Sequence, residues 1–161
     1  MRLLLATLVL AVAFILVTGN SLPPVVASHF AAGGAANGFM PRAIYLRFII
    51  ALLVALPLMI ALLTGITSLL PARFINLPNR EYWLAPERQA DTLAYIRKHG
   101  VHFGVMLTIF LCFVHWLVVQ ANAHNPPLFP EPLFFIGMAA FLGGLVIWLG
   151  RFIVHFRRCR P

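Results

Sequence analysis

The side chains of this sequence that are best suited to chemistry are six histidines, which can transfer protons or bind metals near neutral pH. His115 stands within a long apolar run, where a polar ring is costly and often functional. His99 and His102, three residues apart, would share one helix face, whereas about 220° of helix rotation separates His102 from His115. No residue spacing typical of a zinc or haem site occurs. We therefore expect no metal and no cofactor, and we predict that His115 makes a hydrogen bond between helices.

The apolar runs lack the groups that a hydrolase or a proton pump would need. All four acidic residues lie outside them: Glu81, Glu87, Asp91 and Glu131. The sequence contains no Ser–His–acid order, no phosphate-binding glycine loop and no HExxH motif. Cys112 lies in an apolar run and Cys159 near the C-terminus, so we expect two free thiols rather than a disulfide. The sequence therefore predicts a protein that is not an enzyme.

The composition is that of an integral membrane protein. Of the 161 residues, 61% are hydrophobic and only 10% are charged, with a mean hydropathy of +0.93, whereas soluble proteins contain about 25% charged residues. A membrane span needs about 20 apolar residues at a rise of about 1.5 Å each. Four apolar runs approach or exceed this length: 3–17, 48–70, 101–121 and 133–150. The first run also fits a secretory signal peptide, but no cleavage pattern follows it closely, so we expect it to be retained.

These runs predict an all-α fold, namely an integral membrane four-helix bundle. A two-span unit would cover residues 1–70 and would include a short outer cap loop over residues 20–42. A cytoplasmic loop would follow over residues 71–100, and a second two-span unit with a basic tail would cover residues 101–161.

The loop over residues 71–100 contains signals for a helix of its own. Pro86 and Glu87 suit the first turn of a helix. Arg97 and Lys98 suit its last turn, and Gly100 suits its end. The loop is therefore predicted to contain a separate helix that lies at the membrane interface.

The basic residues predict how the chain is oriented. The formal net charge is +8, from twelve lysines and arginines and four acidic residues. Ten of the basic residues fall in the two termini and the loop over residues 71–100, and the other two are Arg42 and Arg47. Because basic residues accumulate on the cytoplasmic side, we expect a bacterial inner-membrane protein with both termini in the cytoplasm. The charges sit between apolar runs, so the partner is the lipid bilayer and not nucleic acid.

The outer loop over residues 20–42 predicts a compact hairpin-like cap. Pro23 and Pro24 would end the preceding helix, and Val25 and Val26 could begin a short strand. Two glycine-containing pairs, Gly33-Gly34 and Asn37-Gly38, are typical of tight turns because they adopt positive φ angles readily.

An ordered motif in this loop resembles the N-terminal part of the family called domain of unknown function 1648. The motif is a Leu-Pro pair, a valine, a histidine followed by an aromatic residue, a glycine, and a second glycine followed by an aromatic residue. Its members here are Leu22, Pro23, Val26, His29, Phe30, Gly33, Gly38 and Phe39. The resemblance covers about the first third of the chain and implies a small multi-span bacterial membrane protein. Some members resemble the immunity protein against a sporulation-delaying toxin.

The fourth run carries small residues at the spacing that lets helices approach closely. Gly137, Ala140 and Gly144 form one stripe, and Ala139 and Gly143 repeat the four-residue spacing beside it. The stripe could pack within the bundle, against a second copy or against a protein partner.

Two functions remain open from the sequence. The first is a non-catalytic role through protein–protein contacts, as an accessory, sensor or immunity-like component. The alternative is a transporter, or a subunit of a redox or proton-translocating complex, that uses His115.

Overall fold

The computed structural model describes residues 1–157, apart from the side chain of residue 68; Cys159 therefore lies outside the described residues. Four helices are long and apolar enough to cross a membrane, which confirms the four predicted runs as helices. A two-stranded hairpin makes the chain mostly helical rather than all-α. The elements in order are α1 (Arg2–Gly19), β1 (Val25–Phe30), β2 (Ala36–Pro41), α2 (Arg42–Ile66), the short 3-10 turns η1 (Thr67–Leu69) and η2 (Ala72–Phe74), α3 (Arg80–Trp83), α4 (Gln89–Asn122) and α5 (Glu131–Arg157).

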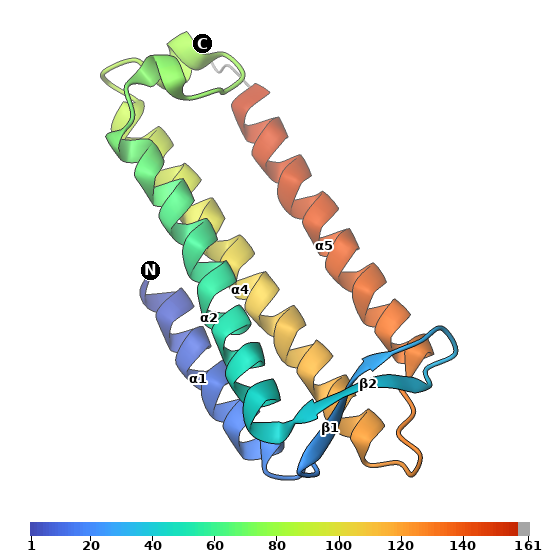
Figure 1. The fold of residues 1–161 in the computed structure, drawn as a ribbon. Coiled ribbons are helices and arrows are strands. Elements are labelled where there is room, and N and C mark those ends of the chain that lie inside the picture. Colours follow the sequence, from blue (N-terminus) through green and yellow to red (C-terminus); the bar gives the residue numbers. More distant parts are fainter. Residues whose placement is uncertain (158–161) are drawn as a thin grey trace.

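Helices α1, α2 and α4 pack side by side and enclose the main core (Figure 1). Each contributes a stripe at helical spacing, because residues three and four apart lie on one face. At one level of this core, Gly104 of α4 lies against Leu4 of α1 and against the carbonyl oxygen of Pro57 in α2. The buried stripe of α1 is Leu4, Leu8, Ala11 and Ile15, and that of α2 is Tyr45, Ile49, Leu53, Pro57 and Ala61.

Helix α4 corrects the prediction of a separate interfacial helix. It runs for 34 residues, from Gln89 to Asn122, and passes through Gly100 without a break. A glycine inside a helix costs only about 1 kcal/mol relative to alanine, and Gly100 has a packing role that offsets this cost. The Thr64 side chain of α2 occupies the space that a side chain at position 100 would need. The residues predicted to form that helix are therefore the first part of α4.

The predicted hairpin is present, but only one of the two proposed turns forms. Strands β1 and β2 pair antiparallel, with Val26 opposite Met40. The turn contains Gly33 and Gly34, whose φ angles are 88° and 78°. Asn37 and Gly38 belong to β2 instead, which corrects the prediction of a second turn there. Gly38 is needed in the strand because the Cβ atom of His29 on β1 leaves no room for a side chain.

Asn122, the last residue of α4, fastens the hairpin to the bundle. Its Oδ1 atom accepts a hydrogen bond of 2.8 Å from the backbone nitrogen of Ala27. Its Nδ2 atom donates to the carbonyl oxygen of Ala27 at 2.9 Å and to that of Val118 at 2.9 Å. One amide side chain thus satisfies both backbone groups of a buried strand residue.

Replacing Asn122 with alanine is expected to loosen the hairpin while leaving the helices in place. Each buried backbone group of Ala27 that loses its partner costs about 1–3 kcal/mol. Hydrogen exchange at the Ala27 amide should therefore become faster by at least about tenfold. Asn125→Ala in the exposed loop beyond α4 is the control. Equal exchange rates in both variants would show that the Asn122 side chain does not stabilise the hairpin.

Helix α5 is attached differently from the other three, since it lies beside α4 and apart from the rest of the bundle (Figure 1). Large rings fill the space between the two helices. Phe110 stacks on Phe141 with ring centroids 4.4 Å apart, and His99 stacks on Trp148 with the same separation. Of the residues of α5, only Phe156 is fully buried.

The segment from η1 to the start of α4 forms the end of the bundle opposite the hairpin, called the loop end below (Figure 1). It holds a small second core of Ile75, Leu77, Leu84, Ile96 and Phe156. The last carbonyl groups of a helix lack partners within the helix. Here the carbonyl oxygen of Phe156 accepts hydrogen bonds from Trp83 Nε1 at 2.9 Å and Asn79 Nδ2 at 3.2 Å. The loop therefore caps α5.

Candidate functional site

His115, the functional candidate from the sequence, lies fully buried between three helices. Its Nε2 atom is 2.9 Å from Thr18 Oγ1 at the end of α1, and its Nδ1 atom is 2.9 Å from Tyr45 Oη at the start of α2. The ring also stacks on Tyr45 and meets Phe14 edge-on. The predicted interhelical hydrogen bond is confirmed: His115 forms one hydrogen bond to α1 and a second one to α2.

The donors and acceptors around His115 define one consistent arrangement. The Thr18 hydroxyl donates to the carbonyl oxygen of Phe14 at 2.7 Å, so it is available to His115 as an acceptor. Nε2–H then donates to Thr18, and Nδ1 accepts from the Tyr45 hydroxyl. A neutral imidazole satisfies both contacts. Ligation of a metal or haem by His115 would require at least one of these hydrogen bonds to break.

The other histidines do not gather around His115. His102 lies on a different face of α4, as the helical spacing predicts, and lines a groove toward α5. Among residues 1–157, no group of three or more His, Cys, Asp or Glu side chains is arranged to hold a metal ion.

Most residues of the outer-loop motif have structural roles in the hairpin. Leu22, which precedes β1, and Val26, which belongs to β1, are both buried. Phe30 stacks on Phe129, with centroids 4.9 Å apart. The backbone nitrogen of Gly33 donates to Glu131 Oε1 at 3.0 Å, which ties the turn to the start of α5.

The remaining residues of the motif lie nearer the surface. Pro23 lies two residues before β1, and Gly38 lies opposite His29. His29 is exposed and is hydrogen-bonded through Nδ1 to Asn37 Oδ1. Phe39 is 57% exposed. The motif therefore forms the hairpin, and the side chains of His29 and Phe39 are exposed on its surface.

The small residues of α5 divide between two faces. Gly137 faces Phe113 of α4, and Gly144 faces the sulfur atom of Met106. Ala140 is exposed, as is Gly143, beside which nothing lies within 4 Å of a side-chain position. The stripe predicted from the sequence therefore packs within the bundle at two positions and remains open at the third.

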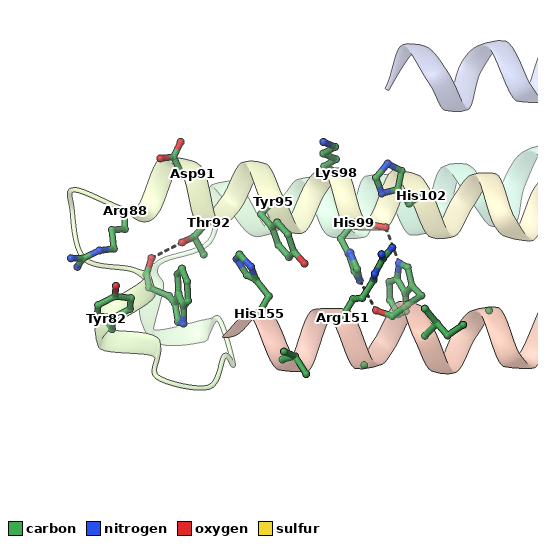
Figure 2. Close-up of a pocket in the computed structure, with 16 residues that line it drawn as sticks. Tyr82, Arg88, Asp91, Thr92, Tyr95, Lys98, His99, His102, Arg151 and His155 are labelled. Carbon is green, nitrogen blue, oxygen red and sulfur yellow. Dashed lines mark hydrogen bonds between the residues drawn. The ribbon is translucent and has the colours of Figure 1, made fainter. Parts of the chain in front are cut away.

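The structure contains a groove between α4 and α5 at the loop end that the sequence did not predict. Its volume is about 1430 Å³. Figure 2 shows Tyr95 and His99 of α4, and His155 and Arg151 of α5, in the space between the two helices. Lys98 and Asp91 also line the groove, but they project from α4 on the side away from α5 (Figure 2).

Paired rings form the floor of the groove. Tyr95 stacks on His155 with centroids 3.9 Å apart. His99 and Trp148 stack and also exchange hydrogen bonds: His99 Nε2 donates to the carbonyl oxygen of Trp148 at 3.0 Å, and Trp148 Nε1 donates to that of His99 at 3.1 Å. These contacts connect α4 to α5 along the groove.

Helical spacing contains a partial signal for this groove. His99 and His102, which the sequence places on one face, both line it, and Tyr95 precedes His99 by one turn. On α5, Trp148 and His155 are seven residues apart and therefore also share a face. Each stripe is recognisable from the sequence, but their pairing is not, because it depends on how far α4 continues before residue 101.

The charges around the groove are mainly positive. Its charged lining residues are three cations and one carboxylate: Arg88, Lys98, Arg151 and Asp91. All four are exposed, as is His102. Three cations with a single acid suit the binding of an anion.

The comparisons with known proteins identify no relative. No protein-family model matches this chain, and no match to it was found among curated proteins or among solved structures.

Proposed function

We propose that this chain is a non-catalytic integral membrane protein that acts through contact with another membrane-spanning protein, and that α5 is the helix that makes the contact. The observation that carries the proposal is that, among the long helices, α5 packs mainly against α4, with small residues left open on its outer side.

Exposed apolar side chains on α5 are not by themselves informative, because lipid tails cover every membrane helix. The small residues are more specific. Ala139, Ala140 and Gly143 are exposed on a helix that otherwise presents large side chains, such as Val146 and Ile147. Small residues let a second helix approach the backbone closely, which increases van der Waals contact where no hydrophobic driving force acts between helices.

The polar groups inside the bundle support a non-catalytic role. Both ring nitrogens of His115 are engaged. The Thr108 hydroxyl donates to the carbonyl oxygen of Gly104 at 2.8 Å. Within the described part of the chain, no buried side-chain nitrogen or oxygen atom lacks a hydrogen-bond partner. The interior therefore presents no polar group that awaits a substrate.

The proposal extends to the family and the location of the protein. Membership of the 1648 family rests on the ordered motif between Leu22 and Phe39. A bacterial inner membrane, with both termini in the cytoplasm, rests on the ten-to-two division of basic residues. The N-terminus of α1 and the C-terminal end of α5 both point toward the loop end, in agreement with this orientation (Figure 1).

Photo-crosslinking in native membranes tests the role of α5. A photoreactive residue at Val146, which is 70% exposed, should give an adduct of defined mass with a protein. The same residue at Leu10 of α1, which is 72% exposed, is the matched control and should crosslink to lipid. The adduct mass distinguishes a second copy from a different protein.

Two results would contradict the proposal. One is a set of identical adducts from both positions, since this would reflect random encounters. The other is a Val146 variant that crosslinks only to lipid.

Introducing leucine at Gly143 should abolish the Val146 adduct, because a large side chain blocks close approach of a second helix.

A further inference from the structure

We propose that the groove between α4 and α5 at the loop end binds the headgroup phosphate of an anionic phospholipid. The inference goes beyond the contact proposed for α5, since it concerns the side of α5 that faces α4. It rests on the charge, the depth and the lateral opening of the groove.

The groove has the side chains that bind phosphate. Arg151 extends from α5 into the space between α5 and α4 (Figure 2). A guanidinium group can hold two phosphate oxygens at once, and a lysine adds a point charge. Lys98 and Arg88 supply further charge at the edge. The single carboxylate, Asp91, projects from the same side of α4 as Lys98 (Figure 2), and the three cations of the lining leave it with a net positive charge.

The groove lies at the depth of lipid headgroups. Leu4 contacts Gly104, which places Arg2 and the N-terminal amine near that level of α4. Helix α2 ends at Ile66, shortly after Thr64 meets Gly100. Helix α4 begins eleven residues before Gly100 (100 − 89 = 11), and at about 1.5 Å per residue this adds about 16 Å beyond the apolar part of the bundle. The first three turns of α4 therefore pass through the headgroup layer.

The aromatic residues around the groove agree with this depth. Trp83, Tyr95 and Trp148 all line it. Tryptophan and tyrosine accumulate where the membrane meets water, because their rings are apolar and their N–H or O–H groups are polar.

The lateral opening favours a lipid over a soluble anion. Helices α4 and α5 form the two sides of the groove, and Tyr82 and Trp83 of α3 line one end of it. Its apolar lining on α5 remains partly open: Ile147 is 63% exposed and Val154 is 47% exposed. An acyl chain can lie along this surface while its phosphate meets Arg151. With the loop end in the cytoplasm, as proposed above, the groove faces the leaflet that is rich in anionic lipid.

Native mass spectrometry of the full chain tests the site. The protein is released from mixed micelles that contain equal amounts of phosphatidylglycerol and phosphatidylcholine, and the retained lipid is counted. We expect preferential retention of phosphatidylglycerol and a loss of about fivefold in that preference for Arg151→Gln. Lys98→Gln should reduce it in the same direction, and Arg151→Lys should keep more of it than Arg151→Gln.

The control is Arg97→Gln, which removes the same charge from an exposed position on α4 that does not line the groove. Equal losses for Arg97→Gln and Arg151→Gln would overturn the proposal, because they would reflect net charge alone. Equal retention of the two lipids by the unmodified chain would also overturn it. In a second arm, millimolar inorganic phosphate or glycerol phosphate should fail to displace the lipid; displacement would identify a soluble phosphate compound as the ligand instead.

Discussion

Replacing His115 with alanine is expected to lower the free energy of unfolding by about 3 kcal/mol. Part of the loss comes from the cavity that the fully buried ring leaves. The rest comes from Tyr45, whose hydroxyl group loses its partner inside the bundle, and from Thr18, which keeps its bond to the Phe14 carbonyl oxygen but no longer accepts one from His115. Because these residues belong to α1 and α2, the loss should weaken the contacts of both helices with α4.

A double-mutant cycle separates the hydrogen bond from the cavity. Unfolding in detergent is followed by circular dichroism for His115→Ala, Tyr45→Phe and the double variant. The two substitutions remove the same interaction, so the double variant should be less destabilised than the sum of the single variants, by about 0.5–2 kcal/mol. His124→Ala is the control, since His124 is exposed beyond the end of α4. Additive effects would show that the Tyr45–His115 hydrogen bond contributes nothing.

Replacing Gly100 with leucine is expected to destabilise the bundle by about 3 kcal/mol through overpacking. Even the first carbon of a side chain at this position would collide with Thr64, and the collision involves Cβ, Cγ2 and Oγ1 of that residue. The shift of a terminal atom cannot relieve it. The two helix backbones must therefore separate at the loop end, which also loosens the groove beside them.

Unfolding measurements on matched glycine variants test this prediction. Gly143→Leu is the control, because Gly143 is also within a membrane helix but has nothing within 4 Å of a side-chain position. In detergent it should be neutral or slightly stabilising, since leucine favours the helix by about 0.5–1 kcal/mol over glycine. Thr64→Ala should recover part of the loss in a Gly100→Ala background. If Gly100→Leu were as stable as Gly143→Leu, the result would contradict the close contact of Thr64 on α2 with Gly100 on α4.

The comparison of these two glycines illustrates what local sequence signals can predict. Gly100 follows Arg97 and Lys98, a pattern typical of a helix end, and yet the helix continues. Glycine ends a helix only when no contact compensates for its flexibility. The contact with Thr64 is formed by a residue 36 positions away (100 − 64 = 36) on another helix. The same limit applies to Asn37-Gly38, where His29 on the opposite strand decides that the pair lies in β2.

The sequence by itself determined the four long apolar helices, the hairpin between the first two, and the interhelical hydrogen bond of His115. Each follows from a strong local energy: the cost of exposing polar backbone in lipid, the steric freedom of glycine, or the cost of burying an unpaired polar ring. Only the tertiary structure decided that α4 continues through Gly100, that α5 packs mainly against α4 among the long helices, and that cationic and aromatic side chains line a groove between them. The physical reason is that these features depend on contacts between residues far apart in the chain, whose energies no local pattern contains.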